Sequence, residues 1–132
     1  MTTDAERFVV DTHSLIWHLT DDDRLSPEAS RTIRRGEAGD CELILPIIVL
    51  AELLRIAEKQ RVNLAFVDVV EWMVHCPTVA VVPFDLPIFS DLIGFGGNLE
   101  LHDRIIAATA KRLGAKVITR DRDSEGVVET LW

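Results

Sequence analysis

Residues 7–19, RFVVDTHSLIWHL, join a short apolar run to a helical pattern with no linker between them. The apolar run at residues 8–10 is typical of a strand buried on both faces, and it ends at Asp11. A helix is expected over about residues 13–20. A strand that passes directly into a helix is half of a β-α unit, so this stretch predicts an α/β fold built on a parallel sheet.

The rest of the chain repeats this alternation of strands and helices. Ser26 with Pro27, Asp85 and Asn63 are expected to begin helices, and Gly114 to end one. Residues 94–98 are expected to form a glycine-rich loop. Ligands of such folds bind beyond the carboxyl ends of the strands. The expected strands are 42–45, 78–82, 116–119 and a short one within 127–132, and the expected helices are about 27–36, 46–61, 63–75, 85–93 and 101–113.

Size and composition predict one domain over residues 1–132. Of its residues 48% are hydrophobic, which suits a packed core. No apolar run reaches the roughly 18–20 residues that span a bilayer, and the polar, acidic N-terminus does not resemble a signal peptide. We therefore expect a cytoplasmic protein without a membrane partner. The two cysteines are expected to be reduced thiols, and the absence of a C-x-x-C motif argues against zinc.

The net charge of −8 restricts the possible partners. A protein that binds nucleic acid mainly through phosphates is normally basic, so a generic nucleic-acid binder is excluded. Contact with RNA would require metal cations or local arginines to offset the repulsion. An acidic surface also suits a basic protein partner.

Four carboxylates stand where an α/β sheet would gather them into one cleft. Asp11 and Asp121 follow strands, Asp103 lies in the first turn of the helix at 101–113, and Glu52 interrupts an apolar helix. Such clusters bind divalent metals and commonly act on phosphate esters. The sequence therefore predicts a metal-dependent site made by Asp11, Glu52, Asp103 and Asp121.

Each acid also has an ordinary structural explanation. Asp11 fits the N-cap of the next helix, Asp103 is favoured by its helix dipole, and turn chemistry accounts for Asp121. The helix around Glu52 is apolar nearly all round, so it is expected to be largely buried, and a buried Glu52 needs a partner, of which Arg55 is the simplest. Asp85 is interpreted as a cap only. The three tryptophans are expected to pack in the fold rather than stack on bases.

Four segments together resemble a PIN domain, and the similarity extends over essentially the whole chain. Residues 101–110, LHDRIIAATA, are the most specific match. The terminal Leu131-Trp132 resembles one PIN subgroup, and the length and motif order are similar to VapC-type toxins of bacterial toxin–antitoxin pairs. The other matching segments are 9–17 (VVDTHSLIW), 50–53 (LAEL) and 118–121 (ITRD).

The resemblance implies a three-layer α/β/α sandwich around a central, mainly parallel sheet. It also implies an endoribonuclease that depends on one or two Mg²⁺ or Mn²⁺ ions, with Asp11, Glu52, Asp103 and Asp121 as its acidic residues. The implied partners are an RNA substrate, a cognate antitoxin and a second copy of the chain in a homodimer. Thr119 is implied as a polar contact to the site.

Several other residues are predicted to contact the substrate from their position alone. Thr12 would lie at a helix N-terminus that favours phosphate, and Arg104 is adjacent to Asp103. The remaining basic candidates are Arg55, Lys59, Arg120 and Arg122.

The sequence departs from the family pattern at two places. One is Pro46 to Val49, where many members carry a small hydroxyl residue, and the other is Glu100, where many carry Asp. The roles of Glu100 and Asp123 stay open.

Two alternatives remain open from the sequence. A receiver-like module would bind Mg²⁺ with similar acids and accept a phosphoryl group on an Asp, but it needs paired acids after the first strand. A non-catalytic interaction domain would use the carboxylates to bind a basic partner.

Overall fold

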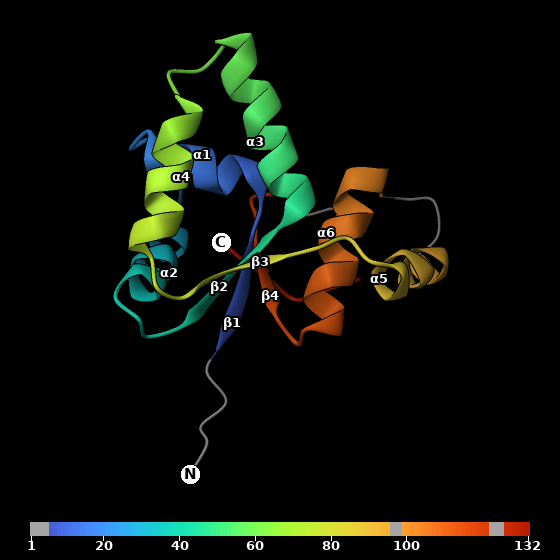
Figure 1. Cartoon of the computed structure of the whole chain (residues 1–132). Helices are drawn as coiled ribbons and strands as arrows, with labels where there is room; N and C mark the ends of the chain where they lie inside the picture. The colour runs from blue at the N-terminus through green and yellow to red at the C-terminus, as the bar shows by residue number, and fades with distance from the viewer. Residues whose placement is uncertain (1–5, 96–98, 122–125) are drawn as a thin grey trace.

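The computed structural model describes residues 6–95, 99–121 and 126–132. These residues form five strands, six α-helices and one 3₁₀ helix (Figure 1). The elements are β1 (Arg7–Val10), α1 (Thr12–Leu19), α2 (Pro27–Glu37), β2 (Glu42–Pro46), α3 (Ile47–Lys59), α4 (Phe66–His75), β3 (Val79–Val82), α5 (Leu86–Asp91), η1 (Leu92–Phe95), α6 (Leu101–Arg112), β4 (Lys116–Ile118) and β5 (Thr130–Leu131).

The strands form one parallel sheet in the order β3-β2-β1-β4-β5. The chain adds β2 and β3 on one side of β1, and then crosses back to add β4 and β5 on the other. In the register, Val9 of β1 lies between Ile44 of β2 and Val117 of β4. The strand order reverses between β1 and β4, and open α/β sheets bind ligands at the carboxyl ends of the strands at such a point.

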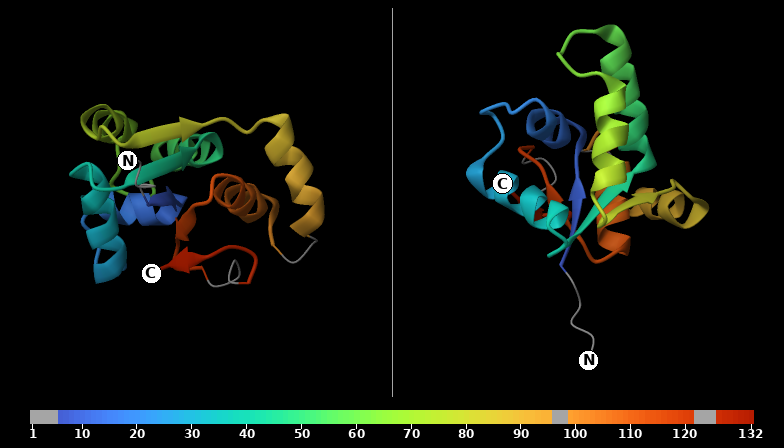
Figure 2. Two further views of the ribbon diagram at one scale, coloured as in Figure 1. Left: turned by 90° about the horizontal axis from the view of Figure 1, so that it is seen from below. Right: turned by 60° about the vertical axis from the view of Figure 1, so that its left-hand side comes forward.

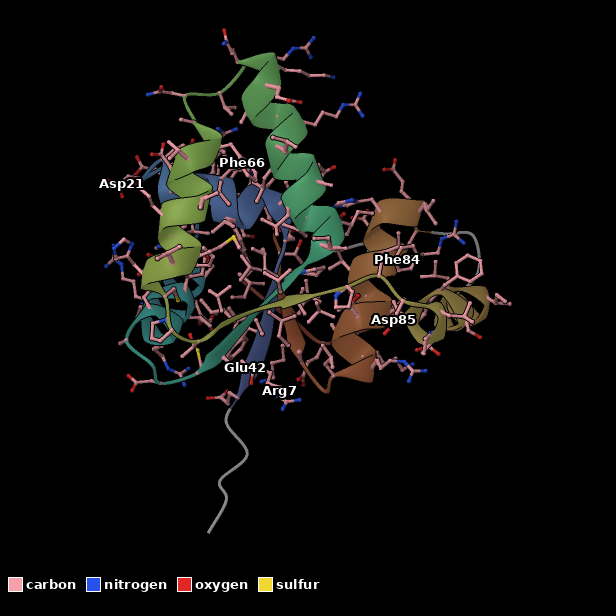
Figure 3. All side chains as sticks on the ribbon, in the orientation of Figure 1. Arg7, Asp21, Glu42, Phe66, Phe84 and Asp85 are labelled. Carbon is pink, nitrogen blue, oxygen red and sulfur yellow. The ribbon has the colours of Figure 1, made fainter. Side chains whose placement is uncertain are left out.

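Helices cover both faces of this sheet. Figure 2 shows α2 and α4 on one side and α5 and α6 on the other. The layered α/β/α arrangement predicted from the sequence is therefore confirmed. The core lies on the central strands, where Phe8, Val9 and Val10 are at most 1% exposed. Arg7 and Glu42 form an ion pair of 3.4 Å at the amino ends of β1 and β2 (Figure 3).

Local capping signals were correct at two helices and wrong at a third. Ser26 and Asp85 accept hydrogen bonds from the backbone nitrogens of Ala29 and Ile88, at 3.0 and 3.1 Å. Asn63 does not begin α4, whose N-cap is Ala65 without a side-chain cap. The helix begins later because Leu64, which is buried, first inserts into the core.

The loop expected at residues 94–98 is wrong for its first two residues, which are helical. Gly94 and Phe95 end the 3₁₀ helix η1 instead, and residues 96–98 lie outside the described residues. The expected end of the following helix is correct, because Gly114 follows α6 with a φ of +64°, in the left-handed region that glycine adopts readily.

The expectation of a largely buried α3 is wrong. Only Val49 and Leu53 of this helix are buried, whereas Ile47 and Leu54 are more than 40% exposed. Figures 1 and 2 show the reason, since α3 and α4 project together past the end of the sheet. An apolar helix in this position buries one stripe and leaves the remaining apolar residues at the surface.

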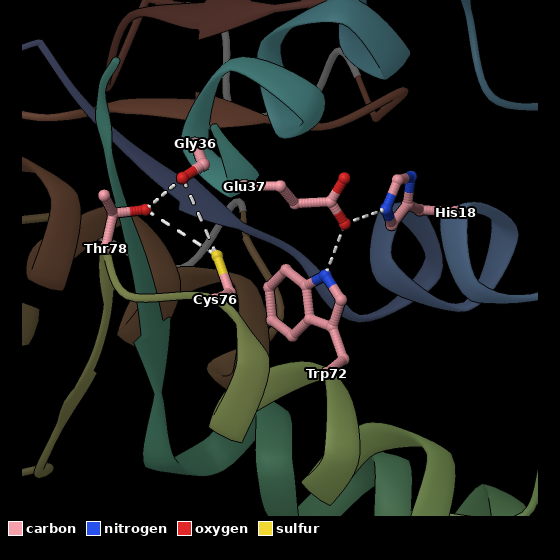
Figure 4. A network of polar contacts seen from close by, with 6 residues as sticks. All are labelled: His18, Gly36, Glu37, Trp72, Cys76 and Thr78. Atoms are coloured by element: carbon pink, nitrogen blue, oxygen red, sulfur yellow. Dashed lines mark hydrogen bonds and ion pairs between the residues drawn. The ribbon is translucent and has the colours of Figure 1, made fainter. Parts of the chain in front are cut away.

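Two polar networks join α2 to its neighbours (Figure 4). Nε2 of His18 and Nε1 of Trp72 each lie 2.7 Å from the same carboxylate oxygen of Glu37, so α1, α2 and α4 meet at one charged group. Oγ1 of Thr78 donates to the carbonyl oxygen of Gly36 at 2.5 Å. Trp72 is therefore a packing residue, as expected. None of the helices in the described ranges is long and apolar enough to cross a membrane.

Candidate active site

The three aspartates of the predicted site belong to elements that end or begin at the same edge of the sheet. Asp11 directly follows β1, and Asp121 follows β4 after two residues. Because α6 leads into the start of β4, the first turn of α6, with Asp103, lies at the opposite, carboxyl edge. The backbone nitrogen of Asp11 donates to the carbonyl oxygen of Ile118 at 3.3 Å, which ties the two strand ends together.

The electrostatics of Asp103 indicate that these acids are neighbours. Burial raises the pKa of its carboxyl most strongly, and the negative charge of Asp121 raises it next. His102 acts in the opposite direction, while Glu100 and Asp11 raise the pKa further. The structure therefore gathers four acids into one negative region, and Glu100 belongs to it together with the three predicted aspartates.

Asp11 caps a helix, as predicted, and also lines a cavity. Its carboxylate caps α1 by accepting from the backbone nitrogen of Ser14 at 2.9 Å. The same residue lines a cavity of about 230 Å³ together with Asp121. Ser14 is buried and donates its hydroxyl to the carbonyl oxygen of Ile118 at 3.1 Å, so it fixes the two strand ends rather than facing a substrate.

Glu52 approaches the site from α3, but its partners differ from those expected. Its side chain is 35% exposed, and the ion pairs among the described residues do not include the expected one with Arg55. Oε1 of Glu52 accepts a hydrogen bond from Oγ1 of Thr12 at 2.5 Å and lies 3.0 Å from Nε2 of His102. Thr12 and His102 therefore hold Glu52 against α1 and α6.

His102 is a residue that the sequence reasoning missed. The only signal for it was its position beside Asp103 in the most specific motif. Its contact with Glu52 depends on how α3 and α6 pack, and a single sequence does not reveal that packing.

The other predicted contacts occupy varied positions. Thr119 is buried, and its hydroxyl accepts from the backbone nitrogen of Asp121 at 3.0 Å, which shapes the turn that carries this acid. Nε of Arg104 is buried and makes no hydrogen bond within the described part of the chain. A buried donor without a partner is costly, and an anion such as phosphate would satisfy it. Arg55 and Lys59 are exposed on α3, and Arg122 and Asp123 lie outside the described residues.

The donor chemistry fits a hard divalent cation. Carboxylate oxygens are the ligands that Mg²⁺ prefers, and the mutual repulsion of these acids is what a cation would neutralise. Within the described ranges, however, no three His, Cys, Asp or Glu side chains are positioned to coordinate one metal ion together. This is compatible with Mg²⁺, which usually keeps several waters and takes only one or two carboxylates directly.

The comparison with known proteins agrees with this architecture. The model of the PIN domain family matches residues 8–128, so the chain belongs to the PIN domain family. It is similar to Ribonuclease VapC22 of Mycobacterium tuberculosis, with 29% identity over an alignment of 120 residues that covers 86% of this chain and 86% of that protein. The resemblance to VapC-type proteins inferred from the four motifs is thereby confirmed.

Two solved structures share the fold. A toxin–antitoxin complex from Klebsiella pneumoniae contains a chain with a TM-score of 0.68 and 23% identity, covering 94% of this chain and 95% of that one. VapC20 of Mycobacterium tuberculosis, described as a sarcin-ricin loop cleaving toxin, has a TM-score of 0.66 and 16% identity, covering 93% of this chain and 98% of that one.

Proposed function

We propose that this chain is a divalent-metal-dependent endoribonuclease that acts as the toxin of a toxin–antitoxin pair. The observation that carries the proposal is the convergence of Asp11, Asp103 and Asp121 at the carboxyl edge of the sheet, close enough for their charges to raise the pKa of Asp103. The family membership and the similarity to a VapC ribonuclease support it.

In this proposal Asp11, Asp103 and Asp121 hold one or two Mg²⁺ or Mn²⁺ ions, with Glu52 beside them. When bound, the cation lowers the pKa of a coordinated water and offsets the charge of the phosphate. Thr12 and His102 keep the Glu52 carboxylate oriented. Arg104 offers its unpaired Nε to the phosphate. Water attacks rather than the ribose 2′-hydroxyl, so the products carry a 5′-phosphate and a 3′-hydroxyl.

The substrate proposed for this site is single-stranded RNA or an RNA loop. An unpaired backbone can enter a narrow acidic site, whereas a regular duplex presents its phosphates on a wide surface. The net charge of −8 is consistent with binding that depends on cations at the site rather than on a basic surface.

The receiver-like alternative fits the fold poorly. Receiver modules have the flavodoxin-like strand order 2-1-3-4-5, whereas this sheet has the order 3-2-1-4-5. The residue after Asp11 is Thr12, so β1 does not supply the paired acids that such a module needs. Stable phosphorylation by acetyl phosphate would nevertheless favour it.

Two exposed apolar faces support the two proposed protein partners. On α4, Val67, Val70 and Val74 are exposed beside the acids Asp68 and Glu71. An apolar and acidic face would repel a copy of itself and suits a basic, amphipathic antitoxin segment.

The second face lies on α5 and η1 and carries little charge. Leu86, Phe89 and Ile93 are 52–80% exposed there, and the nearby Asp91 is already paired with Arg112. Because Asp85 caps the helix and Asp91 is paired, this face carries less unbalanced charge than the α4 face and can meet a second copy of the chain. We therefore assign it to the proposed homodimer.

The decisive experiment is a cleavage assay on a pool of structured RNAs with Mg²⁺, with Mn²⁺ and with EDTA. Wild type is compared with Asp103→Asn and with Asp85→Asn, a matched control because Asp85 caps a different helix and Asn caps equally well. Cleavage should require metal and fall at least about 100-fold in Asp103→Asn only. Equal cutting by all three proteins, or cyclic-phosphate products, would contradict the proposal. Antitoxin-free, metal-loaded protein that cuts nothing would favour the non-catalytic alternative.

A further inference from the structure

A small cavity adjoins the carboxylate site and is lined by residues of a different kind. Asp11 and Asp121 contribute to its wall, and the remaining lining residues are His13, Trp17 and Arg120. Its volume of about 230 Å³ lies below the roughly 300–1,000 Å³ of pockets for drug-sized ligands. A site of this size suits one planar group rather than a large molecule.

The groups at this cavity are those that bind planar, electron-rich rings. The His13 ring lies 5.8 Å from the Trp17 ring, and the Arg120 guanidinium carbon also lies 5.8 Å from the Trp17 centroid. Nucleobases stack on aromatic rings and on guanidinium planes. His13 and Arg120 are both exposed, so each can contact a base directly.

Trp17 has a supporting role in this arrangement. It is only 8% exposed, and the ring of Trp132 packs against it in an edge-on contact at 5.9 Å. A buried ring held in this way is a packing residue, as expected from the sequence. It gives His13, on α1, and Arg120, after β4, a shared rigid surface that fixes their separation.

We propose that this cavity is a nucleotide subsite, in which His13 and Arg120 hold the base of the nucleotide next to the cleaved phosphate of single-stranded RNA. The inference rests on the proposed ribonuclease function and adds to it the residues that hold the base. The position supports it, because a phosphate at Asp11 and Asp121 has its own nucleoside beside the cavity that these two acids line.

Arg24 provides a matched control. Its guanidinium carbon lies 5.1 Å from the Trp17 ring centroid, closer than that of Arg120. Arg24 is paired with Asp22 at 2.8 Å and is not among the residues that line the cavity. Removing Arg24 takes one cation from the same tryptophan without changing the proposed subsite.

The test measures Kd for fluorescein-labelled RNA hexanucleotides of uridine and of adenosine, with DNA hexanucleotides for comparison, in Mg²⁺. The parent is full-length Asp103→Asn, which keeps the labelled RNA intact. His13→Ala and Arg120→Ala should each weaken RNA binding by about 5- to 100-fold, the range expected for one lost stacking contact. His13→Phe should restore binding, Arg120→Lys should restore it only partly, and Arg24→Ala should bind like the parent.

The same series separates this inference from the proposed function. The subsite is overturned if His13→Ala and Arg120→Ala bind within twofold of the parent, or if the parent binds none of the hexanucleotides. It is also overturned if Arg24→Ala loses binding equally, because the effect would then come from Trp17 or from net charge. If wild type cuts no RNA but the two alanine variants still lose binding, the ribonuclease proposal fails and the cavity stands as an RNA-binding site only.

Discussion

The carboxyl of Asp103 illustrates a conflict between stability and function. Its pKa is raised first by burial and then by the charge of Asp121. An acid whose pKa is higher in the folded than in the unfolded state holds its proton more tightly when folded. The free energy of unfolding is therefore largest, and the folded state most stable, below the ordinary pKa near 3.8. It decreases as the pH rises through the raised value.

Removing this charge should therefore stabilise the metal-free protein. In EDTA at pH 7 we expect Asp103→Asn to raise the Tm by about 2–4 °C, with the difference shrinking toward pH 4 as the wild-type carboxyl becomes protonated. Thermal melts across this pH range measure it, with Asp85→Asn as the control that should show no such trend. Mg²⁺ should narrow or reverse the difference, because it binds the wild-type site better. A Tm below wild type at every pH would contradict the argument.

The positions of these residues in the fold could be predicted from sequence where the cause is local, while their roles stay predictions. Asp11 and Asp121 were identified because a strand ends just before each of them, and Asp103 because it lies in the first turn of a clear helix. Glu52 stays a predicted site residue, and its partners differ from the one expected. Its hydrogen bond to Thr12 joins residues 40 positions apart, and its pair with His102 depends on helix packing that no local pattern encodes.

Gly36 determines how closely α2 approaches the sheet. A Cβ atom built on Gly36 would lie 2.3 Å from Cγ of Leu43, a residue of β2 that is fully buried and therefore unable to move aside. The carbonyl oxygen of Gly36 also accepts the hydroxyl of Thr78, which precedes β3. The glycine is thus required by close packing within a helix.

Gly36→Ala tests this requirement directly. Alanine favours a helix by about 1 kcal/mol relative to glycine, so propensity alone predicts stabilisation. Because the new methyl group would overpack the contact with Leu43, we expect a net loss of about 1–3 kcal/mol in the free energy of unfolding. Urea denaturation measures the change. Gly94→Ala is the control, since a Cβ there meets no atom within 4 Å, and an equal loss in both variants would refute the packing explanation.

The elements themselves differed in how well the sequence predicted them. Ser26 and Asp85 signalled helix starts correctly because each side chain caps its own helix. Asn63 did not, because the burial of Leu64 outweighed the local preference for a cap. The parallel sheet followed from the strand–helix alternation, whereas the strand order, with β1 at the centre, depends on long-range pairing that was not predictable residue by residue.

The charge and apolar surface of the whole molecule indicate two separate interfaces. Like charges would oppose self-association through the acidic α4 face. The α5–η1 face carries exposed Leu86, Phe89 and Ile93 with less charge beside them. A surface of this kind is costly to leave in water and is typical of an interaction site. Self-association and antitoxin binding should therefore respond to different substitutions.

Paired double variants test this separation. Phe89→Asp with Ile93→Asp should convert the proposed dimer into a monomer by light scattering after gel filtration, because two charges would be buried without partners. Val70→Asp with Val74→Asp should leave the dimer intact and weaken binding of the proposed antitoxin at least about tenfold. Each double variant is the control for the other, and circular dichroism should show both folded like wild type because all four side chains are exposed. Loss of the dimer in the α4 variant, or unchanged dimerisation in the α5–η1 variant, would mean that the two faces have been assigned to the wrong partners.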